Sequence, residues 1–241
     1  MIDSIVILAG GLATRLRPIT STIPKSLLEI NGKPFIDYQL ELLRKQNITN
    51  VIICAGFMGE EIRKYVGDGD KYGLKISYSF DGDKLLGTGG AVKKALNLIN
   101  GTFYVMYGDS YLNIDFGSIN QYFNKFDKSG LMTVYKNDNK WDKSNIIFEN
   151  GKIVNYDKKV YVPEMKYIDY GLGIFTEKSF TSFRDKEIFD LSDVYTDLLQ
   201  NDNLIGYEVK ERFYEIGSFE GLKETTEFLS GQNKNDGKLY R

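Results

Sequence analysis

Short apolar segments alternate with amphipathic stretches along the first half of the chain. Four of the apolar segments have the length of a strand, are rich in β-branched and aromatic residues, and show no alternation with polar positions: Ile5–Leu8, Val51–Cys54, Ile76–Phe80 and Phe103–Tyr107. Runs of this kind are typical of strands buried on both faces of a parallel sheet. We therefore predict a parallel sheet in this half of the chain.

Helical periodicity fills the segments between these strands. Apolar residues recur on one face of each of three expected helices: Phe35–Gln46, Gly59–Val66 and Gly89–Ile99. A strand–helix–strand rhythm predicts an α/β fold, in which ligands bind at the carboxyl ends of the strands. We therefore look for chemistry-bearing residues directly after each strand.

Strands predominate in the second half of the chain. Asn150-Gly151 is a strong hairpin signal between two of them. Beyond Ser230 the sequence is polar, and we expect a flexible tail over residues 230–241. The expected strands are Leu131–Tyr135, Ile146–Glu149, Ile153–Tyr156, Gly171–Phe175, Ile205–Val209 and Phe213–Ile216, and the expected helices are Asp190–Gln200 and Ser218–Leu229.

Composition narrows the function classes. The 241 residues carry 31 Lys and Arg against 33 Asp and Glu, so a formal net charge of −2 gives no basic footprint for nucleic acid. No apolar run reaches the roughly 18 residues of a membrane span, so we expect no membrane partner. A single cysteine, Cys54, excludes an internal disulfide framework and fits a reducing cytoplasm.

The chain contains no histidine. This excludes Ser-His-Asp and Cys-His nucleophilic sites, histidine general bases and histidine-ligated zinc. Any catalysis must rest on carboxylates, Lys, Arg, backbone amides and hard metal ions.

The first candidate site is the loop that follows the first strand. Gly10 and Gly11 let the backbone turn sharply and approach a ligand, and successive amides in such a turn form a concavity for phosphate oxygens. Arg15, Arg17 and Lys25 add positive charge suited to oxyanions. The alternative is a plain strand-to-helix turn with solvated arginines.

Two further candidates follow at strand and helix ends. Leu86-Gly-Thr-Gly-Gly-Ala91 enters a helix, and its alternative role is glycine capping of that helix. Asp109 stands at the carboxyl end of the fourth buried strand, where a carboxylate is a natural ligand for a hard metal ion. The alternative for Asp109 is a capped turn.

The loop after the first strand resembles the signature of the sugar-1-phosphate nucleotidylyltransferases. That signature is Gly-Gly-x-x-Thr-Arg-Leu-x-Pro followed by Pro-Lys. It stands here as residues 10–18 and as Pro24-Lys25-Ser26-Leu27. The heptose-1-phosphate guanylyltransferases and the N-acetylmuramate-1-phosphate uridylyltransferases look especially similar. The resemblance covers about residues 1–229 and implies one domain with a Rossmann-like, three-layer mixed sheet. Residues 1–115 would form its nucleotide-binding half, and residues 116–229 its sugar-binding half.

The resemblance also assigns expected roles to residues. Arg15, Lys25 and Asp109 would be catalytic, and Asp109 with Glu215 would bind Mg²⁺, although the family has Asp where this chain has Glu215. The family's Glu-Lys-Pro is matched only by Asp157-Lys158, with a shorter carboxylate and no proline. The alternative for Asp157-Lys158 is solvated surface charge, which is the more common role of a lone Asp-Lys pair. The alternative for Glu215 is a side chain that faces solvent from a core strand. Nucleotide binding would involve Leu8, Ala9, Gly10, Gly11, Arg15, Gly87 and Thr88, and sugar-phosphate binding Asp157, Lys158, Asp169 and Gly171.

The implied reaction joins an NTP to a sugar 1-phosphate and gives an NDP-sugar and pyrophosphate. The acceptor phosphate is already ionised near pH 7, so no general base is required and the missing histidines are intelligible. Two alternatives stay open: a cytidylyltransferase for a phosphorylated alcohol such as phosphocholine, and an inactive binding or regulatory paralogue. The nucleobase, with GTP slightly favoured, the sugar and self-association into a homodimer also stay open.

Overall fold

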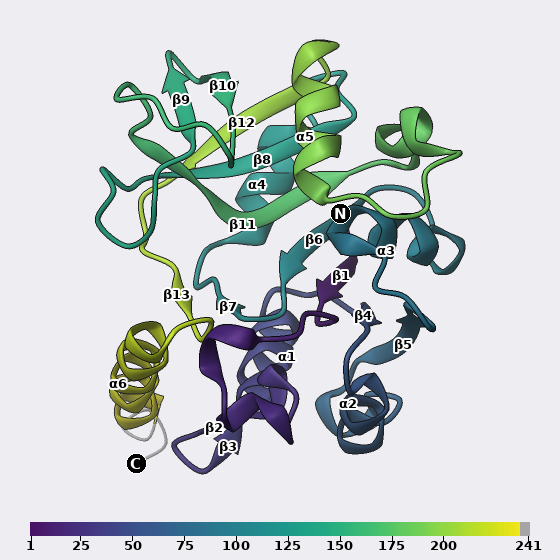
Figure 1. Cartoon of the computed structure of the whole chain (residues 1–241), viewed down its shortest axis with the longest axis vertical. Coiled ribbons are helices and arrows are strands. Elements are labelled where there is room, and N and C mark those ends of the chain that lie inside the picture. The colour runs from purple at the N-terminus through teal and green to yellow at the C-terminus, as the bar shows by residue number, and fades with distance from the viewer. Residues whose placement is uncertain (237–241) are drawn as a thin grey trace.

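The computed structural model describes residues 1–236, with side chains through Gly231. Within that range one mixed sheet of nine strands runs through the molecule in the order β10-β9-β11-β6-β1-β4-β5, with β8 and then β12 attached beside β11 (Figure 1). Its strands are β1 (Ser4–Leu8), β4 (Asn50–Ala55), β5 (Lys75–Phe80), β6 (Phe103–Tyr107), β8 (Gly130–Lys136), β9 (Ile146–Glu149), β10 (Lys152–Tyr156), β11 (Tyr167–Phe175) and β12 (Leu204–Val209).

The four apolar runs of the first half form the parallel part of this sheet. β1 pairs in parallel with β4 on one side and with β6 on the other, and β5 extends the sheet beyond β4. Leu8 is in register with both Cys54 and Tyr107. The carboxyl ends of these strands therefore meet at one edge, and the predicted parallel sheet is confirmed.

The second half adds antiparallel strands to the same sheet. β11 pairs antiparallel with both β6 and β8, whereas β12 runs parallel to β8. β9 and β10 form the expected hairpin, with Asn150 and Gly151 both at positive φ in its turn. The sheet is mixed, as the family resemblance implies.

Helices cover both faces of the sheet. Alternate side chains of β1 enter two different hydrophobic cores, because successive side chains of a strand point to opposite faces of the sheet. Ile5 and Ile7 pack with α1, α2 and α4, whereas Val6 packs with α3 and α5. The helices are α1 (Phe35–Lys45), α2 (Gly59–Val66), α3 (Gly87–Ala95), α4 (Phe116–Phe123), α5 (Leu191–Gln200) and α6 (Phe219–Asp236).

A third, smaller core attaches α6 to the body of the protein. Leu229 of α6 packs with Phe35 and Tyr38 of α1 and with Ile216, which follows strand β13 (Tyr214–Glu215). β13 pairs antiparallel with β7 (Ser110–Tyr111), and β2 (Glu29–Ile30) pairs with β3 (Lys33–Pro34) beneath α1. Figure 1 shows α6 beside these short strands, apart from the main sheet.

The structure corrects several expected element boundaries. The helix expected over Gly89–Ile99 starts at Gly87 and ends at Ala95, and a 3₁₀ turn completes it. Helix α6 continues to Asp236, into the segment where we expect a flexible tail, and positions 237–241 lie outside the described residues. Helix α4, which Asp115 caps, was not expected. In the described residues no helix is long and apolar enough to cross a membrane.

Candidate active site

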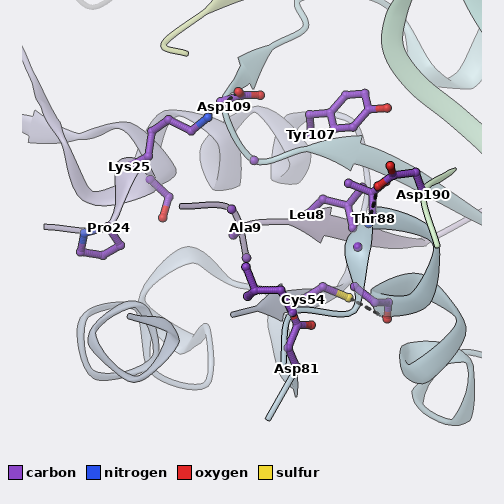
Figure 2. Close-up of a pocket in the computed structure, with 17 residues that line it drawn as sticks. Leu8, Ala9, Pro24, Lys25, Cys54, Asp81, Thr88, Tyr107, Asp109 and Asp190 are labelled. Carbon is purple, nitrogen blue, oxygen red and sulfur yellow. Dashed lines mark hydrogen bonds and ion pairs between the residues drawn. The ribbon is translucent and has the colours of Figure 1, made fainter. Parts of the chain in front are cut away.

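A cavity of about 260 Å³ opens at the carboxyl ends of β1, β4 and β6 (Figure 2). Backbone from the glycine loop forms one wall, and the start of α3 forms another. Its lining residues are Leu8, Ala9, Gly10, Gly11, Pro24, Lys25, Ser26, Cys54, Asp81, Leu85, Gly87, Thr88, Ala91, Tyr107, Gly108, Asp109 and Asp190. Most residues expected to bind nucleotide are thus together in one cavity; Arg15 lies outside its lining.

An ion pair stands at one end of this cavity. Lys25 Nζ lies 2.6 Å from Asp109 Oδ2, and the two side chains are 21% and 24% exposed. Lys25 opens a 3₁₀ turn after the extended residue Pro24, and Asp109 follows the end of β6. Residues 84 positions apart therefore present opposite charges to the cavity, as Figure 2 shows.

Strand β13 brings a second carboxylate to this ion pair. Glu215 is in register with Ser110, and the Ile216 N–H donates to the Asp109 carbonyl at 2.9 Å. A Cβ atom placed on Gly217 would lie 2.6 Å from Glu215 Oε2, 3.0 Å from Arg15 Nη2 and 3.2 Å from Asp109 Oδ2. The side chains of Arg15, Asp109 and Glu215 therefore converge on the backbone of Gly217.

Glu215 also caps the turn that leads into α6. Its Oε2 accepts a hydrogen bond from the Gly217 N–H, and its Oε1 accepts one from the Ser218 hydroxyl at 2.6 Å. A carboxylate at this place satisfies donors that would otherwise lack partners near a helix start. The expected alternative, a solvent-facing Glu215, does not describe this arrangement.

The carboxylate pair fits a magnesium ion. Mg²⁺ is usually held in proteins by one or two carboxylates, with waters and substrate phosphates completing its octahedron. Asp109 and Glu215 supply that number, and no cluster of three metal-ligating side chains occurs among residues 1–236. The donor set therefore suits a metal that arrives with a phosphate ligand.

The start of α3 forms the other side of the cavity. The Thr88 hydroxyl donates to Asp190 at 3.3 Å and accepts from the Leu191 N–H at 2.8 Å, so it is engaged in joining α3 to α5. A Cβ on Gly87 would lie 2.5 Å from the Phe189 carbonyl, and Gly87 has a φ of +72°. Glycine is therefore required here for packing and conformation, and the backbone of this turn faces the cavity.

Asp81, which we did not single out from the sequence, also lines this cavity. It follows β5 as Asp109 follows β6, so the rule that sites lie after parallel strands could have found it. Partial burial raises the pKa of the Asp81 carboxyl, partly offset by the Leu86 N–H and by the charge of Lys94.

A second cavity, of about 300 Å³, adjoins the first at Tyr107. Polar and charged side chains predominate in its lining. Tyr107 lines both cavities. The residues of the second cavity are Tyr107, Asp142, Lys143, Ser144, Asn145, Asp157, Lys158, Tyr161, Ile168 and Asp169. Three of the four residues expected to bind the sugar phosphate are therefore together here.

Lys158 and Asp169 meet at the Tyr107 hydroxyl. Lys158 Nζ donates to this hydroxyl at 3.2 Å and lies 3.7 Å from Asp169 Oδ2, while the hydroxyl is 3.4 Å from the same oxygen. Burial and the Asp169 charge raise the pKa of Tyr107 to about 12, so it stays neutral. Burial alone would lower the pKa of Lys158, but Tyr107 and Asp169 raise it overall. Lys158 is a fixed cation facing the cavity.

The other two expected sugar-binding groups have partners of their own. Asp157 Oδ1 accepts from the Lys159 and Val160 N–H groups, and these bonds lower the pKa of Asp157. The Gly171 N–H donates to Asp169 Oδ1 at 3.0 Å, and Gly171 does not line the second cavity. Gly171 instead permits a close approach, because a Cβ there would lie 3.3 Å from the Tyr107 ring.

Gln39 holds the loop that carries Asp109. Its side-chain amide donates to the Tyr107 carbonyl at 3.2 Å and to the Ser110 carbonyl at 2.9 Å, and the residue is fully buried. A buried polar side chain bonded to both carbonyls that flank Gly108-Asp109 limits the movement of this turn. The sequence offered no signal for this contact, because Gln39 is an ordinary polar position in an amphipathic helix.

Comparisons with known proteins agree with this geometry. The chain is 33% identical over 190 residues to a D-glycero-alpha-D-manno-heptose 1-phosphate guanylyltransferase of Campylobacter jejuni, covering 78% of this chain and 82% of the relative. It is 29% identical over 249 residues to a choline-phosphate cytidylyltransferase of Streptococcus pneumoniae, covering 95% and 99%.

The fold and a family model extend this result over the chain. The solved structure of HddC from Yersinia pseudotuberculosis complexed with GMP-PN superposes with a TM-score of 0.78 and 26% identity, covering 95% of this chain and all of the other. The model of the family described as Nucleotidyl transferase matches residues 4–231. The chain belongs to the nucleotidyl transferase family.

Proposed function

We propose that this protein is a sugar-1-phosphate nucleotidylyltransferase, which joins the nucleotidyl group of an NTP to a sugar 1-phosphate and releases pyrophosphate. The observation that carries the proposal is the pair of cavities that share Tyr107. One has the Lys25–Asp109 pair at its edge, and the other has Lys158. Two phosphorylated substrates could therefore meet beside Tyr107, each with its own cation.

The nucleotide would occupy the first cavity, with its triphosphate along the glycine loop. Lys25 and Arg15 would bind the β- and γ-phosphates, which leave together as pyrophosphate. Asp109 and Glu215 would hold Mg²⁺, which would neutralise phosphate charge during the transfer. Lys25 pairs with Asp109 in the described structure, so this lysine has to exchange a carboxylate partner for a phosphate on binding.

The sugar phosphate would occupy the second cavity, with Lys158 on its phosphate. A phosphate oxygen would attack the α-phosphorus in line with the departing pyrophosphate. This oxygen is already ionised near pH 7, since the second pKa of a phosphate monoester is about 6. Catalysis is then positioning and charge neutralisation, which a chain without histidine can perform.

A cytidylyltransferase acting on phosphocholine is the second candidate, because one relative carries that name. A choline headgroup is a quaternary ammonium ion and requires an aromatic cage without competing cations. The second cavity contains Lys143 and Lys158, and the nearby Trp141 ring is covered by the Arg212 guanidinium at 3.2 Å. This arrangement favours a sugar over choline.

The proposal includes the organisation and setting of the enzyme. We treat residues 1–229 as one catalytic domain with a nucleotide-binding half (1–115) and a sugar-binding half (116–229), since strands of both halves belong to one sheet. A magnesium-dependent, cytoplasmic enzyme of nucleotide-sugar biosynthesis accounts for the carboxylate pair and the single buried thiol of Cys54.

Pyrophosphate release tests the proposal. Each of the four common NTPs is incubated with Mg²⁺ and a panel of heptose, hexose and amino-sugar 1-phosphates, with phosphocholine as a further acceptor. We expect release with at least one sugar 1-phosphate. We also expect loss of release in Asp109→Asn but not in Asp185→Asn, because Asp185 is an exposed residue outside both cavities. Release with phosphocholine alone would favour the cytidylyltransferase, and none with any acceptor would favour an inactive paralogue.

A further inference from the structure

One carboxylate in the first cavity has no role in the mechanism above. Asp81 lies away from the Lys25–Asp109 pair, at the side of the cavity near Cys54 (Figure 2). Its Oδ2 accepts one long hydrogen bond, 3.4 Å from the Leu86 N–H. Lys94 Nζ bonds to the Asp81 backbone carbonyl and not to its carboxylate. Among residues 1–236 this carboxylate therefore keeps most of its accepting capacity for a ligand.

The other polar side chains at this side of the cavity are already engaged. The Cys54 thiol donates to the Ala91 carbonyl at 3.4 Å, and the Thr88 hydroxyl is held between Asp190 and Leu191. Asp190 also belongs to the capping box of α5. The apolar side chains of Leu8 and Leu85 complete the surroundings. A ligand that enters here meets a mainly apolar slot with one unsatisfied acceptor group.

The position of Asp81 indicates which part of the nucleotide it contacts. Phosphates belong at the cationic end, beside Lys25 and Arg15, and a carboxylate next to them would repel them. Asp81 Oδ2 would lie 2.9 Å from a Cβ on Gly56, which follows β4, and 3.4 Å from one on Gly10, at the start of the glycine loop, whereas Lys25 and Arg15 come from beyond that loop. The uncharged end of an NTP, its nucleobase, is the part that can approach Asp81 favourably.

We infer that Asp81 reads the nucleobase and selects guanine. A carboxylate pairs best with two adjacent donors, and guanine presents them as N1–H and the 2-amino group. Uracil offers one N–H between two carbonyl oxygens, which a carboxylate repels. Cytosine and adenine each offer an amino group beside a ring nitrogen that is an acceptor. This inference rests on the proposed function and narrows its nucleotide to GTP.

Nucleotide binding without a sugar phosphate tests the inference separately from catalysis. Calorimetric affinities for the magnesium complexes of GTP, ITP, XTP, UTP and CTP are compared. ITP differs from GTP only by lacking the 2-amino group. We expect wild type to bind GTP about 10- to 100-fold more tightly than ITP, as is typical for one hydrogen bond to a charged group. Comparable affinities for GTP and ITP, or tighter binding of UTP or CTP than of GTP, would overturn the inference.

Asp81→Asn provides a gain of binding that misfolding cannot produce. Xanthine has a carbonyl where guanine has the 2-amino group, and an asparagine amide can donate to it. We expect the variant to bind GTP about 10- to 100-fold more weakly and XTP more tightly than wild type does. The control, Asp83→Asn, changes an exposed carboxylate two residues away and should leave all affinities unchanged.

The outcomes separate this inference from the proposed function. Unchanged GTP and XTP affinities in Asp81→Asn would refute the role of Asp81. If the variant fails to fold, the wild-type ratio of GTP to ITP affinity still decides the case. Efficient turnover of UTP or CTP with a sugar 1-phosphate would keep the proposed function and refute guanine selection. Asp81-dependent binding of GTP without pyrophosphate release would support guanine selection and contradict the proposed function.

Discussion

Replacing Glu215 separates a structural role from a catalytic one. Its carboxylate caps the turn before α6 through the Gly217 N–H and the Ser218 hydroxyl, and it also stands beside Asp109. In Glu215→Gln the remaining oxygen can accept from Gly217, and the new amide can donate to Ser218 Oγ. Both hydrogen bonds can therefore survive, and what the variant loses is the negative charge.

The two roles predict effects of different size. Loss of charge near a helix start costs about 0.3–1 kcal/mol, and replacing a charge-assisted hydrogen bond by a neutral one costs about 1 kcal/mol. For a domain of this size, 1–2 kcal/mol corresponds to a fall in Tm of roughly 2 to 8 °C. Loss of a charged metal ligand should lower turnover by about 100-fold or more, the size found when a positioned electrostatic group is removed.

Turnover and melting are therefore measured on the same preparations. Pyrophosphate release is followed at 25 °C at limiting and saturating Mg²⁺, and Tm is followed by circular dichroism. Glu215→Asp keeps the charge and should retain much of the activity, although its shorter side chain reaches the Gly217 N–H less well. If Glu215→Gln lost only a few degrees of Tm and kept wild-type turnover at both Mg²⁺ concentrations, Glu215 would be a cap and nothing more.

Four further outcomes follow from other contacts. Asp109→Asn should lower turnover at least ~100-fold at saturating Mg²⁺ while preserving the circular dichroism spectrum, and near-normal turnover would contradict its metal role. Lys158→Ala should raise the KM for the sugar phosphate and leave nucleotide affinity unchanged, whereas Lys159→Ala, at an exposed neighbouring position, should change neither. Equal effects of Lys158→Ala on both substrates would contradict the assignment of Lys158 to the sugar phosphate. Gln39→Met removes two buried hydrogen bonds, so we expect the free energy of unfolding to fall by about 1–3 kcal/mol in denaturant titrations. Turnover should also require more Mg²⁺, because the loop that carries Asp109 is no longer held. An unchanged Mg²⁺ requirement would mean that Gln39 contributes to stability alone. Because the pKa of Asp81 is raised in the folded state, wild type loses stability as pH rises through the acidic range. Asp81→Asn should therefore have a higher Tm than wild type at pH 7, and this difference should shrink below about pH 4. A lower Tm for the variant at pH 7 would contradict the predicted direction.

The sequence predicted the parallel part of the sheet because burial on both faces leaves an unbroken apolar run, a local signal. β1, β4, β5 and β6 each lie within one residue of the expected ends. Helix α4 was missed although the signal is present: Asp115 is an N-cap, and Phe116, Ile119 and Phe123 follow it at helical spacing.

The residues of the candidate site likewise fall into those that a local sequence signal identifies and those that it does not. Asp109 and Lys25 were identified because they belong to segments next to strand ends or to a recognisable motif. Gln39 was not, because its function arises from two backbone carbonyls contributed about 70 positions later in the chain. The capping bonds of Glu215 likewise depend on the geometry of its own turn, which the residue types alone do not determine.

Among the described residues, Tyr107 alone lines both cavities, and this has an evolutionary consequence. Base choice and acceptor choice would be encoded in nearly separate sets of side chains, so a duplicated copy of this protein could change one preference without disturbing the other. Effects of substitutions at Asp81 and at Lys143 should then add, as they do for sites without common partners. Substitutions of Tyr107 should break that additivity, which makes this ring the one position at which the two specificities have to evolve together.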